Sequence, residues 1–567
     1  MGLECNIRVA GEAGQGMKTI GHVLAEMFVK AGYNVYSNMD YMSRIRGGNS
    51  YYQLRVSGKP VFAIREKTDI VIALDKESVA LHEKSLNVDG IMVLDAARYG
   101  NKEMKANYLD VPLFDIAKGT GGAEIFVNAA ACGVAAALTS VDHDFLEDTL
   151  KHVFKDKRSE MLESNLKTAR KAYESVKPKK EICLPDINRS SEVGRYIMDG
   201  NDAIALGAIK AGCKFYSAYP MSPSTSIMST VARYSDRYNI VVEQAEDEIA
   251  AINMVIGASF AGARSMTGTS GGGFALMGEG ISLAGMTETP VVIVNAQRPA
   301  PATGLPTRTE QADLDLVIYA GHGEFARAVY APGTAEEAYR LTIKAFETAD
   351  RFQVPVIILT DQHLADSVRN IAGLNADDIK IKKHVITQAD ISGDPSGYKR
   401  YRITGSGISP RAVPSWIEDV MYVDSDEHTE EGHITEDADM RVKMVNKRSR
   451  EKIELLMNVV EPPVTYNIAG SETVLVGFGS TYGAIREAAV RKDIGLVHLP
   501  QVWPFPSKEL LSIVKGAKRV ITVENNATAQ LAGLIRRETP LRIDRSILKY
   551  DGRPFNVDML MNEIKGL

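Results

Sequence analysis

The sequence has few cysteines, and they are scattered. Its four cysteines are Cys5, Cys132, Cys183 and Cys213, and no two of them share CxxC spacing or stand beside a pair of histidines. Zinc and iron–sulfur sites need several thiolate or imidazole ligands close together. We therefore expect no metal site in this chain, and we expect each cysteine to behave as a small buried apolar residue.

Long hydrophobic runs and an excess of basic charge are also absent. No apolar stretch reaches the roughly 20 residues that a membrane-spanning helix requires. The first residues, MGLECNIRVAG, carry no signal-peptide pattern. The formal net charge is −6, and no run of Lys and Arg lies among aromatic residues, so the composition argues against a nucleic-acid partner. These features predict a cytoplasmic protein without a membrane or nucleic-acid partner.

What is present is the pattern of an α/β protein. With 567 residues the chain is long enough for about three to four domains. Short apolar runs of strand type alternate with helical patterns, which indicates parallel sheets covered on both faces. We predict three doubly wound units, at 1–177, 195–374 and 460–567. A linker at 178–194 and an irregular connecting segment at 375–459 separate them.

A glycine-rich loop, GEAGQG, follows the first predicted strand. Gly14 and Gly16 leave backbone N–H groups open at the start of a helix, which favours an anion. The loop is not a P-loop, because its lysine does not directly follow the last glycine, and it lacks the third glycine of a dinucleotide fingerprint. A tight turn and a phosphate cradle both fit. Arg44 and Arg46, in a later loop, could receive a phosphate or a partner, or face solvent.

In the central unit, polar residues follow several predicted strands. These strands are KFYSAY, NIVVEQA, ARSMTGTS, TPVVIVNAQ and VPVIILTD. The carboxyl ends of parallel strands meet at one edge of a sheet, where such sheets bind ligands. We therefore expect four features to converge there: the Ser222 loop, the helix start at Glu248, the turn at 269–273 and Arg298.

The loop YPMSPST holds its hydroxyl groups between two prolines. Pro220 and Pro223 fix φ and keep the residues before them out of helix. Ser222 should therefore have a defined position before a helix begins near residue 226. A proline turn with a serine or threonine N-cap would give the same pattern.

Three acids, Glu246, Asp247 and Glu248, open the next helix. One acid would suffice to complement the helix dipole. The helix behind Glu248 consists mostly of small or apolar residues, so this carboxylate could be buried and take part in proton transfer. A helix cap and a functional acid both remain possible on this pattern.

Further along, TSGGG provides three successive glycines after a strand, where a planar ligand or another backbone could approach closely. Arg298 follows the next strand, and Arg308 lies in a loop rich in Gly, Pro and Thr. Two guanidinium groups near one sheet edge suit the binding of a carboxylate or phosphate. A single arginine would more often form a surface ion pair.

The stretch DSDEHTEEGHITEDADM contains His428 and His433 among many carboxylates. Its spacing fits no standard metal site. We predict an exposed acidic loop.

Several separated motifs together resemble the α subunit of 2-oxoacid:ferredoxin oxidoreductases. They are YPMSPST, EDEIAAINMVIGAS, TSGGG, QRPAPATGLPTRTEQADL and EHTEEGHITED. The N-terminal GEAGQG and MSRIRGGNS resemble the γ domain of the same family, fused ahead of α. The resemblance implies a γ domain at 1–177, a pyrimidine-side thiamine diphosphate domain at 195–374 and a transketolase C-terminal-like domain at 460–567. The family loop is usually YPITPSS, and the smaller Ser222 of this chain puts the pocket shape in question.

The resemblance implies oxidative decarboxylation of a 2-oxoacid on thiamine diphosphate. Coenzyme A takes the acyl group, and electrons leave through a [4Fe–4S] cluster to ferredoxin. The residues expected at the cofactor are Glu248, Thr269, Ser270 and Gly271. Those expected at the substrate are Tyr219, Ser222, Arg298 and Arg308. The expected catalytic residues are Glu248, Ser222 and Arg308. Those expected at coenzyme A are Gly14, Gly16, Arg44 and Arg46.

The resemblance also implies a β subunit that shares the cofactor and holds Mg²⁺ and the [4Fe–4S] cluster. The chain itself has no GDG motif for a metal-bound diphosphate and no cysteine cluster. We expect activity only with β, in an (αβ)₂ assembly, with 2-oxoglutarate as substrate. The alternatives are pyruvate, branched-chain or broad-range 2-oxoacids, or a non-catalytic transketolase-like scaffold. A nucleotide site at GEAGQG is a further hypothesis.

Overall fold

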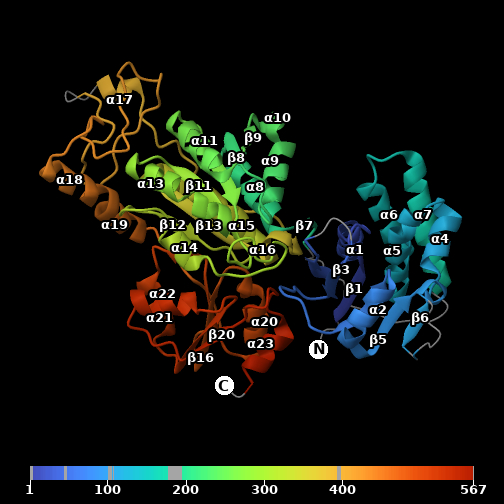
Figure 1. Cartoon of the computed structure of the whole chain (residues 1–567). Helices are drawn as coiled ribbons and strands as arrows, with labels where there is room; N and C mark the ends of the chain where they lie inside the picture. The colour runs from blue at the N-terminus through green and yellow to red at the C-terminus, as the bar shows by residue number, and fades with distance from the viewer. Residues whose placement is uncertain are drawn as a thin grey trace. The chain divides into compact units, whose positions relative to one another are not determined.

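The computed structural model describes residues 4–43, 47–99, 105, 107–176, 194–392 and 397–565. They form two compact units, each built from separated parts of the chain (Figure 1). The first unit takes in the described residues of 1–199, 366–373 and 555–566, and the second those of 200–365 and 374–554. Three mixed sheets with helices around them confirm the α/β class. The five-part division of the chain remains a prediction, and the predicted linker lies almost wholly outside the described residues.

The first unit contains an eight-stranded sheet in the order β6-β5-β4-β1-β3-β2-β14-β7. Its strands are β1 (Glu4–Glu12), β2 (Asn34–Asp40), β3 (Asn49–Ser57), β4 (Thr68–Ala73), β5 (Leu86–Leu94), β6 (Tyr108–Asp110), β7 (Tyr196–Met198) and β14 (Val368–Ile371). The half from β1 to β6 is parallel, as in a doubly wound sheet. In the other half, β3 is antiparallel to β1 and β2, because residues 41–48 are too few for the crossover that a parallel pair of β2 and β3 needs. β14 is antiparallel to both β2 and β7.

Helices pack tightly against this sheet and against one another. They are α1 (Met17–Lys30), α2 (Lys76–His82), α3 (Ala96–Tyr99), α4 (Leu113–Gly121), α5 (Val127–Leu138), α6 (His143–Val153), α7 (Ser159–Val176) and α23 (Val557–Glu563). The alanine-rich α5 is buried along nearly its whole length. A Cβ on its Gly133 would clash with the backbone oxygen of Ala169 in α7, so the glycine permits this close packing.

The second unit contains a seven-stranded sheet in the order β18-β12-β13-β11-β10-β8-β9. Its strands are β8 (Phe215–Ala218), β9 (Val241–Gln244), β10 (Ser265–Thr269), β11 (Val291–Gln297), β12 (Ala328–Tyr330), β13 (Pro355–Asp361) and β18 (Gln501–Trp503). All pairs except β12–β18 are parallel. The five strands predicted for this domain from apolar runs are therefore confirmed, and their carboxyl ends share one edge.

The helices around this sheet are α8 (Gly200–Lys210), α9 (Thr225–Arg233), α10 (Ser235–Tyr238), α11 (Glu248–Phe260), α12 (Gly271–Leu276), α13 (Gly278–Met286), α14 (Leu314–Ile318), α15 (Ala335–Phe352) and α16 (Gln362–Asp366). Asp247 caps α11 by accepting a hydrogen bond from the backbone N–H of Ala250 at 2.7 Å. The helix therefore starts at Glu248 itself, and Glu246 precedes it.

A five-stranded sheet, in the order β15-β17-β16-β19-β20, follows near the end of the chain. Its elements are β15 (Val464–Tyr466), β16 (Thr473–Phe478), β17 (Gly495–Leu499), β19 (Arg519–Glu524), β20 (Arg545–Leu548), α20 (Tyr482–Lys492), α21 (Ser507–Val514) and α22 (Gln530–Glu538). Its apolar residues belong to the same buried cluster as those of the central sheet. The two α/β domains of the second unit therefore share one hydrophobic core.

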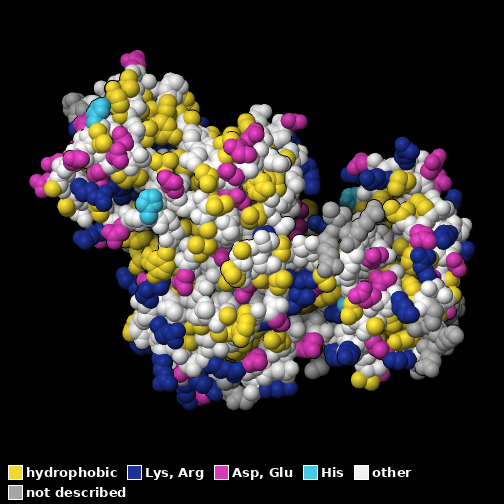
Figure 2. Space-filling view, in the orientation of Figure 1, with side chains coloured by type: hydrophobic (Ala, Val, Ile, Leu, Met, Phe, Trp, Pro, Cys, Tyr) yellow, Lys and Arg dark blue, Asp and Glu magenta, His cyan; other side chains and the backbone are white. Residues whose placement is uncertain are grey.

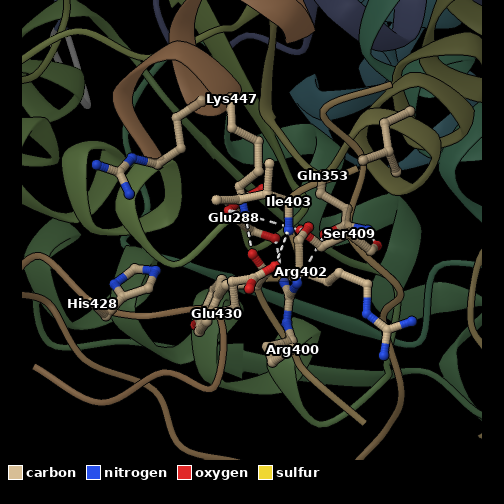
Figure 3. A network of polar contacts seen from close by, with 12 residues as sticks. Glu288, Gln353, Arg400, Arg402, Ile403, Ser409, His428, Glu430 and Lys447 are labelled. Atoms are coloured by element: carbon tan, nitrogen blue, oxygen red, sulfur yellow. Dashed lines mark hydrogen bonds and ion pairs between the residues drawn. The ribbon is translucent and has the colours of Figure 1, made fainter. Parts of the chain in front are cut away.

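The connecting segment is joined to the central domain by a buried ion cluster. It carries α17 (Gln388–Ser392), α18 (Ala438–Val445), a π-helical turn at Asn446–Glu451 and α19 (Lys452–Met457). Glu288 lies 2.7 Å from Lys447 Nζ and 2.6 Å from Lys452 Nζ, and Figure 3 shows Lys447 and Arg400 converging on it. Burial alone would raise the pKa of Glu288, but these ammonium groups outweigh it and hold that pKa well below its usual range. Removing one partner would leave a buried charge uncompensated, at a cost of about 3–5 kcal/mol.

The acidic stretch around His428 is only partly exposed. His428 is fully buried with its ring 4.1 Å from that of Tyr401, and Glu427 forms a paired ion contact with Arg448 at 2.7 and 2.9 Å. The predicted exposed acidic loop is therefore wrong for these two residues, because Arg448 supplies a partner that the local sequence does not reveal. His433 is exposed beside Tyr422.

Hydrophobic and acidic side chains mix on the surface of the connecting segment (Figure 2). Among the described residues, no single helix is long and apolar enough to cross a membrane. One pair of helices, Leu113–Gly121 with Glu124–Leu138, would reach that length and apolarity only jointly, across a 119° bend.

Candidate active site

The carboxyl ends of β8, β10 and β11 bring together most of the residues that the sequence singled out. Thr269, the last residue of β10, donates its hydroxyl toward Met221 Sδ at 3.7 Å. Arg298, directly after β11, donates from Nη1 to the backbone oxygen of Ser222 at 2.6 Å. The predicted convergence of the Ser222 loop, the 269–273 turn and Arg298 is thereby confirmed.

The YPMSPST loop is fixed by hydrogen bonds within the loop and by one from helix α8. Ser224 Oγ and the Ser224 N–H both bond to the Met221 backbone oxygen, at 2.8 and 2.9 Å. Asn201 of α8, which is fully buried, donates to the Pro223 backbone oxygen at 2.8 Å. Ser222 is exposed at the tip of the loop, and Tyr219 keeps 42% of its surface accessible. The loop therefore presents these two side chains outward from a rigid backbone.

Glu248 is buried at the start of α11 and faces the glycine turn. A Cβ on Gly273 would clash with both Glu248 Oε1 and Thr269 Oγ1. Only a glycine at 273 lets the turn come so close to the carboxylate. Among the described residues, Glu248 Oε1 is buried without a hydrogen-bond partner. A buried acceptor of this kind costs free energy unless a ligand satisfies it.

Ser270 and the first glycines of the turn extend this arrangement. Ser270 precedes α12 but does not cap it, and its buried Oγ has no partner among the described residues. No atom lies nearer than 3.9 Å to the position of a Cβ on Gly272. The turn thus offers open backbone next to two unsatisfied polar side chains. A polar, planar ligand group could fill that space and accept or donate hydrogen bonds.

Asp313 is a site residue that the sequence analysis missed. Its carboxylate lies against Gly271, where a Cβ would clash with it, and accepts from Asn295 Nδ2 at 3.2 Å. Burial raises the pKa of Asp313 to about 6, although Asn295 and the Arg298 charge oppose the shift. Burial also lowers the pKa of Arg298, against the opposing charge of Asp313. An acid that can change protonation near neutral pH therefore lies beside the glycine turn.

Arg308 is nearly buried in the loop that follows Arg298. Its N–H bonds to the Leu305 backbone oxygen at 3.1 Å, and its side chain packs against Gly552. The next residue, Thr309, donates its hydroxyl to Asp361 Oδ1 at 3.3 Å and accepts from the His363 N–H at 3.2 Å. The loop is therefore attached to the end of β13.

The four residues predicted for coenzyme A belong to the first unit or lie outside the described residues. Gly14 and Gly16 both have positive φ, and Gly16 is the N-cap of α1. A Cβ on Gly16 would clash with Asn128 Nδ2, so the turn is tight as well as open to an anion. Arg44 and Arg46 lie outside the described residues.

Three of the four cysteines are described, and all three are buried and free. Burial raises the pKa of the Cys132 thiol to about 12 and that of Cys213 to about 12. The prediction of small, apolar-like cysteines is confirmed for these three residues. Cys183 lies outside the described residues.

Comparison with known proteins agrees with this geometry along the whole chain. "Pyruvate ferredoxin/flavodoxin oxidoreductase" matches residues 6–175, "Pyruvate flavodoxin/ferredoxin oxidoreductase, thiamine diP-bdg" matches 206–447, and "Pyruvate:ferredoxin oxidoreductase core domain II" matches 471–559. The alpha subunit of a 2-oxoacid:ferredoxin oxidoreductase from Sulfolobus sp is 34% identical over 618 residues, which cover 97% of this chain and 95% of that subunit. The chain belongs to this family of alpha subunits.

Other relatives define how far the similarity goes. A 2-oxoglutarate synthase subunit, KorA, from Archaeoglobus fulgidus is 34% identical over 338 residues, covering 58% of this chain and 88% of KorA. The solved 2-oxoglutarate:ferredoxin oxidoreductase from Magnetococcus marinus, with 2-oxoglutarate, coenzyme A and succinyl-CoA bound, is 30% identical with a TM-score of 0.91. It covers 100% of this chain and 99% of the matched chain. This 2-oxoacid:ferredoxin oxidoreductase alpha subunit thus has a thiamine diphosphate-binding domain behind a γ-like domain. A relative named for 2-oxoacids in general and one named for 2-oxoglutarate are each 34% identical to it, over 97% and 58% of this chain, so identity alone does not fix its substrate.

Proposed function

We propose that this alpha subunit acts on 2-oxoglutarate, which is oxidatively decarboxylated with coenzyme A to an acyl-CoA and CO₂ while ferredoxin receives the electrons. The observation that supports this substrate most directly is the pair of arginines, Arg298 and Arg308, in one loop region at the edge of the thiamine diphosphate domain. 2-Oxoglutarate carries two carboxylates, and two guanidinium groups match that charge better than they match pyruvate. The similarity to a structure that binds 2-oxoglutarate and coenzyme A supports the same choice.

The side chains around the glycine turn fit the pyrimidine end of thiamine diphosphate. Glu248 Oε1 and Ser270 Oγ are buried without partners among the described residues, and Thr269 and Gly271 border the same turn. Glu248 would share a proton through Oε1 with a ring nitrogen of the cofactor, and Ser270 would bond to its polar edge. When bound, thiamine diphosphate supplies a nucleophilic carbon and an electron sink for decarboxylation. The burial of Glu248 excludes water that would compete for this proton.

The substrate would lie at the tip of the YPMSPST loop. Arg298 already donates to the Ser222 backbone oxygen and so lies beside the exposed Ser222 hydroxyl. Arg308 would bind a carboxylate of the oxoacid, and Tyr219 would cover the substrate from the exposed side. Oriented binding of this kind converts an encounter into a unimolecular step and lowers the barrier substantially.

Other parts of the reaction would come from outside the second unit. Gly14 and Gly16, with Arg44 and Arg46, would bind the phosphates of coenzyme A, because a glycine turn at a helix N-terminus suits an anion. A β subunit would share thiamine diphosphate and hold Mg²⁺ and the [4Fe–4S] cluster, in an (αβ)₂ assembly in the cytoplasm. The name subunit alpha, which the relatives from Sulfolobus sp and Sulfurisphaera tokodaii carry, supports the existence of such a partner.

The test is the reduction of a low-potential dye by this chain with its β partner, thiamine diphosphate, Mg²⁺ and coenzyme A. We expect 2-oxoglutarate to be turned over with a higher kcat/KM than pyruvate. Arg298→Met should raise the KM for 2-oxoglutarate by about 10- to 100-fold, because a charge-assisted hydrogen bond of about 1.5–3 kcal/mol is lost. The matched control is Arg233→Met, at an exposed arginine in the last turn of α9.

Each other outcome names an alternative. If kcat/KM is higher for pyruvate or for a branched-chain oxoacid, and Arg298→Met lowers it alike for all substrates, then that oxoacid is the substrate and 2-oxoglutarate is not. No reduction with any oxoacid, despite a stable complex with an intact cluster, would leave a transketolase-like scaffold in place of a catalytic subunit.

A further inference from the structure

The carboxyl edge of the C-terminal sheet is filled by a loop of the central domain. Strands β16 and β19 end at Phe478 and Glu524. In an open α/β sheet this edge is where a ligand usually binds. Here the loop at 307–315, which carries Arg308, lies against it and takes up its hydrogen-bonding groups.

Gln311 is the centre of this contact and is fully buried. Its N–H donates to the Asn525 backbone oxygen at 2.7 Å, and its Oε1 accepts from the Asn525 N–H at 3.1 Å. Its Nε2 donates to the Phe478 backbone oxygen at 2.9 Å. Asn526 Nδ2 donates to the Gln311 backbone oxygen at 3.3 Å. Every polar group of Gln311 is therefore used on the C-terminal domain.

Neighbouring residues of the loop are held in the same way. Gln530 Nε2 donates to the Ala312 backbone oxygen at 2.8 Å, and Gln530 Oε1 accepts from the Asp315 N–H at 3.1 Å. On the side of Arg308, the Thr309 N–H donates to the Gly552 backbone oxygen at 3.3 Å. The loop is thus fastened to the C-terminal domain at points on both sides of Gln311.

Glycines of the C-terminal domain permit this close approach. Gly479 follows β16 with a positive φ, and a Cβ there would lie only 2.7 Å from Gln311 Nε2. A Cβ on Gly552 would lie 3.2 Å from Arg308 Cβ. Because Gly552 also has positive φ, larger residues are disfavoured at both positions.

The anion site at the start of α22 is also occupied from within. Glu524 is fully buried, and its carboxylate accepts from the Leu531 N–H at 2.7 Å and the Ala532 N–H at 3.0 Å. Asn526 Nδ2 donates to the same carboxylate at 3.0 Å. The positive end of the helix is thus neutralised by a carboxylate of the chain itself, at the place where a phosphate would otherwise bind.

We infer that the C-terminal domain serves as a holder for the Arg308 loop, and that Gln311 is a positioning residue that sets oxoacid affinity through Arg308. This inference rests on the proposed role of Arg308 at the substrate. A guanidinium binds a carboxylate well only in one orientation, and a displacement of about 1 Å at a binding group can cost about 10²-fold in rate. The hydrogen bonds to Phe478, Asn525, Asn526 and Gln530 fix the backbone on which Arg308 stands.

A double-mutant cycle in the complete complex tests this inference. Gln311→Ala should lower kcat/KM for the oxoacid by about tenfold or more, while the KM for coenzyme A stays within about twofold. In an Arg308→Met background the same change should lower kcat/KM by less than about twofold, because the group through which Gln311 acts is already gone. Gln530→Ala, at a half-buried position, should give a smaller loss of about three- to fivefold with the same dependence on Arg308.

The matched control is Thr522→Val. Thr522 is buried in the same C-terminal sheet and donates to Ser546 Oγ at 2.8 Å, a partner within that sheet and outside the loop. It should destabilise the domain to a similar degree and leave kcat/KM within about twofold. Hydrogen exchange gives a readout that needs no turnover: Gln311→Ala and Gln530→Ala should speed exchange of the amides at 308–315 but not of those in β10 and β11.

The inference is overturned if Gln311→Ala or Gln530→Ala lowers kcat/KM equally in both backgrounds. It is also overturned if both variants leave kcat/KM unchanged, or if Thr522→Val lowers it as much. If Gln311→Ala does not fold, the cycle with Gln530→Ala decides. A failure of the proposed function looks different: Arg308→Met by itself would then retain the kcat/KM of the unmodified enzyme.

Discussion

The second unit contains two sheets whose carboxyl edges have opposite character. At the edge of the central sheet, Glu248 Oε1, Ser270 Oγ and Asn295 Oδ1 are buried and lack partners among the described residues. At the edge of the C-terminal sheet, the carboxylate of Glu524 and the amide of Asn526 are bonded within the chain. Both domains follow the same architectural rule, yet we propose a ligand at the central edge and none at the C-terminal edge.

The difference separates a binding domain from a supporting one. Unsatisfied buried polar atoms cost free energy, and at the central edge the proposed cofactor would satisfy them. Satisfied atoms at the C-terminal edge stabilise the fold and fix the Arg308 loop. Isosteric changes of the unsatisfied side chains at the central edge should therefore affect activity more than stability, and isosteric changes at the C-terminal edge should affect stability first.

Glu248→Gln should give the largest effect at the central edge. We expect kcat to fall by about 10²- to 10⁴-fold, because a proton-transfer group is replaced by an amide of the same size. The free energy of unfolding of the chain without cofactor should stay the same or rise, because no hydrogen bond of Oε1 is lost. Dye reduction and thermal unfolding measure the two quantities. If Glu248→Gln kept most of its activity, the central edge would no longer differ from the C-terminal edge as a binding site.

Gly273→Ala should disturb the same edge by a steric route. Its Cβ would clash with Glu248 Oε1 and Thr269 Oγ1, so we expect destabilisation of about 3 kcal/mol together with weaker thiamine diphosphate binding. Denaturant unfolding and cofactor titration would show both effects. Gly257→Ala, in α11 where nothing lies within 4 Å, is the control and should stabilise the helix slightly. If Gly273→Ala and Gly257→Ala changed stability and cofactor binding equally, the close contact of the 269–273 turn with Glu248 would have no role in either.

Glu524→Gln should weaken the C-terminal edge. The amide nitrogen cannot accept a hydrogen bond from the α22 backbone, so one buried N–H loses its partner and we expect a loss of about 2 kcal/mol. Denaturant unfolding would measure it. Glu509→Gln, an exposed acid in the first turn of α21, should change stability by less than about 0.5 kcal/mol. If the start of α22 did not depend on the Glu524 carboxylate, Glu524→Gln would leave the free energy of unfolding unchanged.

Asp313→Asn should produce the smallest change, and its sign should depend on pH. Burial raises the pKa of Asp313 to about 6, so the folded state keeps this proton at pH values where the unfolded chain has lost it. Asp313 therefore lowers stability progressively as the pH rises from about 4 to about 6, and the full cost remains above that range. The amide should gain about 1–2 kcal/mol at pH 8 and nothing near pH 4. A pH series of unfolding curves would test this, with Asp315→Asn as the control at a neighbouring acid.

The sequence predicted the central sheet and most of its edge well, because both leave local signals. Runs such as VVIVNAQ predict a buried strand, and a residue directly after it must lie at the sheet edge. Glu248 was found because its helix has a recognisable acidic start. Asp313 and Asn201 were missed. Asp313 lies inside the motif QRPAPATGLPTRTEQADL, but no local pattern marks its carboxylate as buried, and Asn201 lies outside the quoted motifs. Their burial arises only when distant segments come together.

Long-range partnerships explain the other gaps. β14 pairs with β2 through Val368 and Ser37, and Asn370 donates to Asn34 at 3.1 Å, across more than 330 residues. No local periodicity reveals such a pairing. The partial burial of Glu427 was missed for a related reason, since its partner Arg448 lies on the π-helical turn that follows the acidic stretch. The acidic composition of the stretch predicted that Glu427 is exposed, but its ion pair with Arg448 partly buries it.

The last helix of the chain completes the first unit. Arg65 donates to both carboxylate oxygens of Asp558 at 2.9 Å, 493 positions further along, and the Val557 N–H bonds to the Ile64 backbone oxygen at 3.2 Å. During translation at about 5–20 residues per second, the ribosome needs roughly 25–100 s to pass from Arg65 to Asp558. During that interval Arg65 has its ion pair with Glu4 but lacks Asp558, so the first unit is completed only after α23 has been made.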